Sequence, residues 1–160
     1  MDEEQIIRKS DSFSQRRRDV MVLTFPSVEW MEEYKKQINS SEGYKKAAAT
    51  WTAGPVALVI SAKPEIGISE DFGMWLDLHQ GICKDAKKVS LEEAQKAPFC
   101  ITGDYARWKQ VIKKELEPVK GMMQGKLKLK GDLPTIVRYV KASQELVECT
   151  TRINTKFLDE

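Results

Sequence analysis

The most constraining feature of the sequence is a strict alternation of lysine and leucine over residues 126–130. Successive side chains of a β-strand point to opposite faces of its sheet, so Leu127 and Leu129 share one face and the three lysines share the other. Gly131 then interrupts the strand, and Asp132 is a suitable helix N-cap. The pattern predicts a strand with one buried face that is followed directly by a helix.

The other periodicities predict the chain order helix, helix, three strands, helix, strand, helix. Apolar residues at helical spacing mark the helices, and short apolar or alternating runs mark the strands. Helices are expected over residues 26–39, 41–53, 104–117 and 133–147, and strands over residues 56–60, 74–79, 97–102 and 126–130. Residues 84–96 are interpreted as a charged loop or a turn of helix.

This order predicts a two-layer α+β domain with helices over one face of a sheet. The first three strands are close enough in sequence to form an antiparallel meander. The fourth strand follows a helical crossover and is expected to lie parallel to a neighbour. Residues 1–25 form a polar N-terminal extension that includes Arg16–Arg18, residues 26–158 form the domain, and the final polar residues are expected to be loosely held.

Composition narrows the class of protein. The chain has 160 residues, of which 41% are hydrophobic, so it can bury a core and is not globally disordered. No apolar run approaches the roughly 20 residues that span a bilayer, and the acidic start shows no secretory signal. The three cysteines have no metal-ligand spacing, which favours reduced thiols and a cytoplasmic location.

The sequence offers little catalytic machinery. Asp77 and His79 alternate on one predicted strand and could form a dyad, but a single histidine beside polar residues on a strand is usually a surface residue. Cys100 lies in an apolar strand, where an inert buried thiol is expected. A single histidine excludes multi-histidine metal sites, and the glycines form no phosphate-binding loop. We expect neither catalytic residues nor a cofactor or metal.

The net charge of +2 hides two segments of opposite sign. Residues 105–130 contain eight basic and two acidic residues, a net charge of +6, whereas residues 65–77 carry four acidic residues and no basic one. A solvated surface explains both segments. The basic segment could also contact an anionic membrane transiently. Nucleic acid is not expected, because the lysines lack interleaved exposed aromatic residues.

Residues 121–132, Gly-Met-Met-Gln-Gly-Lys-Leu-Lys-Leu-Lys-Gly-Asp, resemble the signature of the sterol carrier protein type 2 domain. Residues 99–104 are similar to that family's third strand where it leads into a lysine-bearing helix. The resemblance spans roughly residues 27–150. It implies a mixed, mainly antiparallel five-stranded sheet with helices on one face and a hydrophobic tunnel between the layers. The fifth strand would come from residues 84–96 or 119–124.

The same resemblance implies binding of fatty acids, acyl-CoA, phospholipids or sterols without catalysis. The candidate lining residues are the apolar side chains that the periodicity turns inward, and an ordinary core explains each of them as well. They are Phe99, Ile101, Trp108, Ile112, Met122, Met123, Leu127, Leu129, Ile136, Val137 and Val140.

The leading hypothesis is therefore a non-enzymatic lipid-binding or lipid-transfer protein, whose partner is an apolar small molecule. The alternative is an interaction or accessory scaffold with a filled core. That alternative, in which a homodimer is one arrangement, would present an apolar patch around Val59 and Trp75 on the open face of the sheet. An enzyme that uses Asp77 and His79 is the third hypothesis.

Overall fold

The computed structural model describes residues 21–160, so Arg16–Arg18 lie outside the described residues. The elements follow one another as β1 (Leu23–Phe25), α2 (Val28–Asn39), α3 (Glu42–Ala47), β2 (Val56–Ile60), the 3-10 turn η1 (Pro64–Ile66), β3 (Phe72–His79), β4 (Ile82–Val89), α4 (Leu91–Ala94), β5 (Phe99–Gly103), α5 (Tyr105–Ile112), α6 (Pro118–Met123), β6 (Lys128–Lys130), α7 (Leu133–Arg138), α8 (Val140–Thr151) and β7 (Thr155–Phe157).

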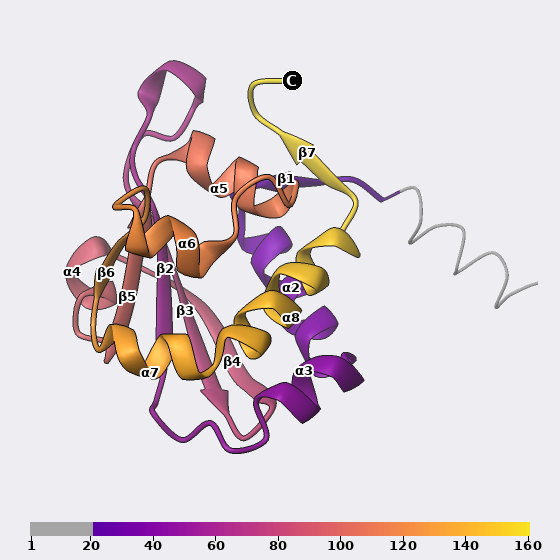
Figure 1. Cartoon of the computed structure of the whole chain (residues 1–160). Helices are drawn as coiled ribbons and strands as arrows, with labels where there is room; N and C mark the ends of the chain where they lie inside the picture. The colour runs from indigo at the N-terminus through magenta and orange to yellow at the C-terminus, as the bar shows by residue number, and fades with distance from the viewer. Residues whose placement is uncertain (1–20) are drawn as a thin grey trace, which may run out of the picture.

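Five strands form the main sheet in the order β4-β3-β2-β5-β6 (Figure 1). The central pair, β2 and β5, is parallel, with Val56 opposite Phe99 and Ile60 opposite Gly103. The pairs β2–β3, β3–β4 and β5–β6 are antiparallel. The mixed, mainly antiparallel five-stranded sheet is therefore confirmed.

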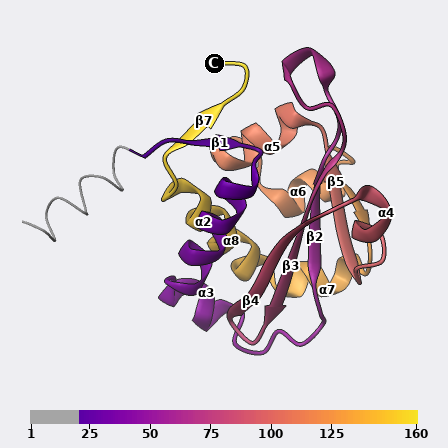
Figure 2. The same cartoon turned by 180° about the vertical axis from the view of Figure 1, so that it is seen from behind.

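The larger helices cover one face of this sheet, as the two-layer prediction requires (Figures 1 and 2). Along β2, Val56 and Ile60 belong to the main core beneath these helices, while Ala57 and Val59 face the other side. The short helix α4 lies on that second face, where its Ala94 completes a small second core. The sheet is thus covered on both faces near its centre, which the one-face prediction did not include.

The strand directions differ from two predictions. The strand predicted at residues 97–102 does not continue an antiparallel meander, because β5 pairs parallel with β2. The last predicted strand does not lie parallel to a neighbour, because β6 returns antiparallel to β5. The antiparallel meander instead consists of β2, β3 and β4. The sequence analysis interpreted most of the residues of β4 as part of a charged loop or a turn of helix.

The hairpin of β3 and β4 explains how the fifth strand forms. Gln80 and Gly81 connect the strands, and both have positive φ angles, of 46° and 84°, as a two-residue hairpin turn of type I′ requires. Gly81 also lies against the backbone of Lys45 in α3, so a Cβ at this position would stand 2.8 Å from the carbonyl oxygen of Lys45. The hairpin tip is therefore packed against α3. Of the two candidate segments for the fifth strand, residues 84–96 contribute it, and residues 119–124 form most of α6 instead.

All four predicted helices are shorter or interrupted, and the third, α5, ends at Ile112 rather than at residue 117. The first begins at Val28 with Ser27 as its N-cap, rather than at Pro26, and the second ends at Ala47. The predicted helix over residues 133–147 is divided into α7 and α8 at Tyr139. This division changes which side chains of the segment face the core.

The two ends of the described chain lie side by side. β1 and β7 form a small parallel sheet that pairs Leu23 with Thr155 and Phe25 with Phe157 (Figure 1). Residues 23–25 therefore belong to the folded unit, although the sequence pattern placed them in the extension. The final residues are not loosely held, contrary to the prediction, because Phe157 packs in the main core.

No helix within residues 21–160 is long and apolar enough to cross a membrane.

Leu127 is 1% exposed, and close contacts from two glycines fix its position. A Cβ at Gly103 would lie 2.6 Å from one methyl of Leu127, and a Cβ at Gly121 would lie 3.1 Å from the other. The predicted strand over residues 126–130 is reduced to β6, and Leu127, which precedes it, inserts into a tightly packed junction between β5 and α6.

We predict that Leu127→Asp unfolds the domain, because it places an unpaired charge in this apolar junction. Thermal and urea unfolding would measure the loss. Lys128→Asp is the matched control, since Lys128 is exposed and is expected to tolerate the same new side chain. Equal stability of the two variants would contradict the packing described here.

Candidate apolar ligand cavity

An apolar cavity of about 110 Å³ lies between the helices and the sheet. Alternate residues of β2, β3 and β5 form its floor, and α2, α3, α5, α6, α7 and α8 contribute its walls. Its lining consists of Phe25, Trp30, Tyr34, Tyr44, Ala48, Trp51, Val56, Leu58, Met74, Leu76, Leu78, Ile101, Trp108, Val111, Ile112, Pro118, Met122, Ile136, Tyr139, Ala142, Ser143, Leu146, Val147 and Thr150.

Most polar atoms of the aromatic lining are bonded to the protein. The indole nitrogen of Trp108 donates to the carbonyl of Val59 at 2.8 Å. The indole nitrogen of Trp51 donates to the carbonyl of Gly54 at 2.9 Å. These bonds satisfy the donors without a ligand and leave the ring surfaces available for apolar contact.

The aromatic residues of the first helix are held in the same way. The indole nitrogen of Trp30 donates to the hydroxyl of Thr155 at 2.9 Å, which ties α2 to the strand β7. The hydroxyl of Tyr34 donates to the carbonyl of Leu146 at 3.0 Å, which ties α2 to α8. Burial raises the pKa of Tyr34 well above its ordinary value, so this hydroxyl stays protonated and keeps donating.

Within residues 21–160, none of the side chains that line the cavity is charged. A buried charge needs an opposite charge or several hydrogen bonds to offset its desolvation. The cavity therefore suits a neutral, largely apolar occupant.

The cavity is small in this conformation. Pockets that bury a whole small molecule are usually about 300 Å³ or larger, and an engineered cavity of about 150 Å³ holds benzene. The 110 Å³ seen here is below both values, so a long chain would require the helical layer to move away from the sheet. A continuous tunnel remains an expectation from the family resemblance.

Five of the eleven predicted lining residues border the cavity, namely Ile101, Trp108, Ile112, Met122 and Ile136. Phe99 and Leu127 are buried in the main core outside the lining, and Leu129 is half-buried against it. Whether any of these side chains contacts a ligand stays a prediction.

The inward orientation predicted for Met123, Val137 and Val140 is wrong. These side chains are 66%, 43% and 36% exposed. Met123 is the last residue of α6, next to its C-cap, and the division at Tyr139 turns Val137 and Val140 outward. The apolar spacing that suggested one continuous inner face therefore crosses a break between two helices.

Most of the missed lining residues come from the first half of the chain. Phe25, Trp30, Tyr34, Tyr44 and Trp51 all border the cavity. The detectable signal was the density of aromatic residues between residues 25 and 51, since large rings at helical spacing cover the most apolar area per residue. The family motif lies in the last third of the chain and carries no information about them.

The candidate reactive groups lie apart from the cavity or are unreactive. Asp77 and His79 lie on the face of β3 opposite Leu76 and Leu78, which line the cavity. Burial raises the pKa of the Cys83 thiol to about 11, and it also raises the pKa of Cys100 and Cys149. At neutral pH these three thiols are protonated and poorly nucleophilic.

The open-face patch that the scaffold alternative requires is not found around Val59 and Trp75. Val59 is fully buried beneath α4, and Trp75 is half-buried. The ammonium group of Lys87 lies over the Trp75 ring, 5.5 Å from its centroid. A cation at this position keeps the indole from presenting a bare apolar surface.

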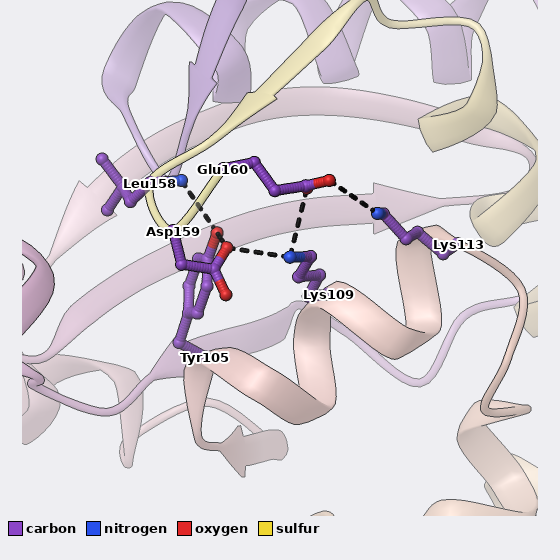
Figure 3. A network of polar contacts seen from close by, with 6 residues as sticks. All are labelled: Tyr105, Lys109, Lys113, Leu158, Asp159 and Glu160. Atoms are coloured by element: carbon purple, nitrogen blue, oxygen red, sulfur yellow. Dashed lines mark hydrogen bonds and ion pairs between the residues drawn. The ribbon is translucent and has the colours of Figure 1, made fainter.

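Two lysines of the basic segment, residues 105–130, form ion pairs with the C-terminal residues (Figure 3). The ammonium group of Lys109 lies 2.8 Å from a carboxylate oxygen of Asp159 and 3.1 Å from one of Glu160, and Lys113 lies 3.1 Å from Glu160. The hydroxyl of Tyr105 donates to Asp159 at 3.1 Å and accepts from the backbone nitrogen of Leu158 at 2.9 Å. These contacts fasten the chain after β7 to α5.

The other basic residues of this segment are distributed around α6 and β6. Lys114 pairs with Glu148 on α8, and Lys130 donates to the carbonyl of Gln95. In the described part of the chain, Lys120, Lys126 and Lys128 form no ion pair and are exposed. Lys130 and Arg107 also form no ion pair within residues 21–160, so most of the uncompensated positive charge of the basic segment lies at Lys120, Lys126, Lys128 and Lys130 around α6 and β6.

Comparison with known proteins gives concordant results. The model of the SCP-2 sterol transfer family matches residues 31–143. A crystal structure of sterol carrier protein 2 is 37% identical to the chain, with a TM-score of 0.73 over 79% of this chain and 97% of that one. The solution structure of a conserved hypothetical protein from Thermus thermophilus, named as a candidate sterol carrier protein, is 36% identical, with a TM-score of 0.74 over 81% of this chain and 90% of that one.

A more distant structure, the apo form of sterol carrier protein 2 from Yarrowia lipolytica, shares the fold. It is 16% identical to the chain, with a TM-score of 0.53 over 82% of this chain and 96% of that one. None of the curated proteins matches the chain in sequence.

The C-terminal network of Figure 3 predicts a defined pH dependence. Hydrogen bonds from Lys109 lower the pKa of Asp159, and bonds from Lys109 and Lys113 lower the pKa of Glu160. A carboxylate with a lowered pKa stabilises the fold at pH values above its ordinary pKa, about 4, and this contribution is lost as the pH falls through the lowered value. The double variant Asp159→Asn with Glu160→Gln should therefore melt slightly below the original protein at pH 7, with a difference that shrinks as the pH falls through the lowered pKa values of the two carboxyl groups.

The decrease at pH 7 should be no more than a few degrees, because exposed ion pairs contribute little. Thermal unfolding at several pH values would measure it. The control is Glu65→Gln with Glu70→Gln, which removes the same charge from two exposed sites. An equal, equally pH-dependent decrease in this control would show that net charge, rather than the network, is responsible.

Proposed function

The chain belongs to the SCP-2 sterol transfer family, and from this premise we propose that it binds an acyl or isoprenoid-like lipid in its apolar cavity without catalysing a reaction. Membership confirms the resemblance carried by residues 121–132. Lipid binding or transfer is the function that the family description and the sterol carrier relatives support. The observation that carries the assignment to this cavity is its lining, which contains no charged side chain among the described residues.

The energetics of chain burial favour this function. Each methylene group removed from water gains about 0.8 kcal/mol, so a dozen methylenes gain on the order of 10 kcal/mol before the costs of ordering and of opening the cavity. Because the cavity of about 110 Å³ is too small for such a chain, part of this gain would offset the separation of helices from sheet. Micromolar binding corresponds to a binding free energy of about 8 kcal/mol. The remainder of the gain from chain burial, a few kcal/mol, is then available to separate the helices from the sheet.

A groove beside the cavity is the entrance in this proposal. It has a volume of about 310 Å³ and is bordered by Lys114, Leu116, Glu117, Pro118, Gln144, Val147 and Glu148. Pro118 and Val147 also line the cavity, so they separate the two spaces. The ion pair of Lys114 and Glu148 spans the groove between the end of α5 and α8. A shift of α8 would widen both spaces together.

The proposal includes a cytoplasmic location and transient contact with anionic membranes. Lys120, Lys126 and Lys128 would make that contact, because their charges are exposed and uncompensated by ion pairs within residues 21–160. Clustered lysines near an anionic surface each contribute about 1 kcal/mol, which is sufficient for reversible encounter but not for stable anchoring. A homodimer remains a separate expectation.

Native mass spectrometry before and after delipidation would test the binding proposal. We expect an exchangeable apolar ligand on the original protein. Ala142→Leu places extra carbon atoms inside the cavity and should weaken that binding at least tenfold while the protein stays folded. Ala106→Leu adds the same atoms to the exposed side of α5 and should bind normally.

Absence of any bound or exchangeable apolar ligand on the original protein would contradict the proposed function. Equal binding by Ala142→Leu and Ala106→Leu would contradict the assignment of the ligand to this cavity. Thermal unfolding of both variants checks that any loss of binding does not reflect loss of the fold.

Membrane contact would be measured by co-sedimentation with phosphatidylserine-containing vesicles. Lys126→Gln with Lys128→Gln should reduce the bound fraction several-fold at low salt, and added salt should reduce binding of the original protein. Lys45→Gln with Lys46→Gln removes the same charge from α3, away from β6 (Figure 1), and is the control. Equal losses in the two double variants would contradict a localised membrane-binding surface.

A further inference from the structure

The turn between α6 and β6 carries an apolar side chain that the packed core does not use. Met123 is 66% exposed, the largest exposed fraction among the large hydrophobic residues within residues 21–160. Its neighbour Met122 is buried and lines the cavity, so Met123 stands on the outer surface of the cavity wall. Single exposed apolar residues are common on protein surfaces. The backbone and the charges around Met123 distinguish it from the other exposed residues.

The backbone of this turn is fixed by hydrogen bonds, although most of its side chains are exposed. The backbone nitrogens of Lys126 and Leu127 both donate to the carbonyl of Gly121, at 2.8 and 3.1 Å. Gly125 has a φ of 74°, in the left-handed region that glycine favours after a helix, and a Cβ at this position would meet open space. The buried Leu127 anchors the turn from the inside. Met123 is therefore held on a rigid turn that faces open space.

The charged residues on either side of Met123 in the chain are all basic. Residues 118–131 contain four lysines and no acidic residue, and the lysines are Lys120, Lys126, Lys128 and Lys130. All four are exposed, and none forms an ion pair within residues 21–160. The acidic residues at the two ends of this stretch, Glu117 and Asp132, are engaged as the N-caps of α6 and α7. The positive charge beside Met123 is thus available to an anionic surface.

Another exposed apolar residue lies in a different electrostatic setting. Ile82 is 45% exposed and belongs to β4, at the opposite edge of the sheet from β6. Its neighbours in the chain have mixed charge, because Asp77 and Asp85 accompany the lysines of β4. Mixed charges attract an anionic surface less than a stretch of one sign does. Ile82 is therefore a suitable internal comparison for Met123.

We propose that Met123 inserts into the interface of an anionic bilayer while the four lysines that flank it lie against the lipid headgroups. The inference rests on the proposed function, to which it adds an apolar anchor and the orientation of the protein on the membrane. Buried apolar area combined with attraction to anionic lipid is typical of reversible binding at the membrane surface. This orientation places α6, whose Met122 lines the cavity, next to the bilayer.

The first test attaches an environment-sensitive fluorophore at residue 123 and measures its emission with phosphatidylserine-containing vesicles. Met123→Cys provides the attachment point, because the three native thiols are buried, have raised pKa values and react slowly. The emission should increase and shift to the blue when vesicles are added, and lipids that carry a quencher should quench it. Ile82→Cys is the matched control, and its label should show neither change.

The second test separates insertion from attraction by charge. Met123→Gln keeps the size and the charge of the side chain but removes its apolar surface, and it should lower the affinity for the same vesicles about threefold. Met123→Trp should raise that affinity several-fold, since tryptophan favours the membrane interface. Ile82→Gln is the control and should bind as the original protein does. All three variants should keep their thermal stability, because both positions are exposed.

The outcomes distinguish this inference from the proposed function. Insertion is contradicted if the label at residue 123 responds no more than the label at residue 82, or if Met123→Gln binds vesicles as tightly as the original protein. Membrane contact by the lysines would stand in either case. If the original protein binds no anionic vesicles at low salt, that contact fails and the insertion of Met123 fails with it. Lipid binding in the cavity is measured separately by native mass spectrometry and does not depend on these results.

Discussion

The parallel pairing of β2 with β5 is the contact on which the rest of the structure depends. It lies at the centre of the sheet and joins residues that are about 40 positions apart in the chain. Both faces of this pair are buried, since Ile101 points to the cavity while Ala57 and Cys100 point to the second core. The β3–β4 hairpin can then extend the sheet on one side and β6 on the other. The small helix α4 follows from the same constraint, because a buried parallel pair needs cover on its second face as well.

The cavity is a place where this packing is incomplete. The helices contribute large rings whose polar atoms are bonded to backbone or threonine partners, as the contacts of Trp30 and Trp108 show. Such rings are held in position by directional bonds, so the layer keeps its shape without filling all of the space beneath it. Empty apolar volume forfeits dispersion contacts and lowers stability. A cavity that can accept an apolar lipid chain therefore lowers the stability of the fold relative to a completely packed core.

The sequence predicted those features that depend on local periodicity or on a family motif. The alternation of residues 126–130 identified a strand, although β6 comprises only Lys128–Lys130 and the buried Leu127 precedes it. The motif of residues 121–132 identified the family. The edge strand β4 was not recognised, because half of its eight side chains are exposed and charged and its strongest signal is a positive-φ turn at Gln80 and Gly81. Strand direction was also mispredicted, since it depends on which distant segments pair. The exposure of Val137 and Val140 results from a break at Tyr139 that helical spacing alone does not reveal.

The pairing of β1 with β7 restricts how the helical layer can move. It joins the beginning of α2 to the end of α8, so the two helices are fixed to each other at this end. α2 is clamped at its far end too, because the Asn39 side chain exchanges two hydrogen bonds with the backbone of Cys83, at 2.8 and 2.9 Å. The far end of α8 is held by the Tyr139 hydroxyl, which lies 2.9 Å from the hydroxyl and 3.1 Å from the carbonyl oxygen of Thr50. A helix of twelve residues is about 18 Å long, so a rotation of about 10° moves its free end by about 3 Å. Because Tyr139 holds that end of α8 to Thr50, the helix can make such a movement only when these two contacts break.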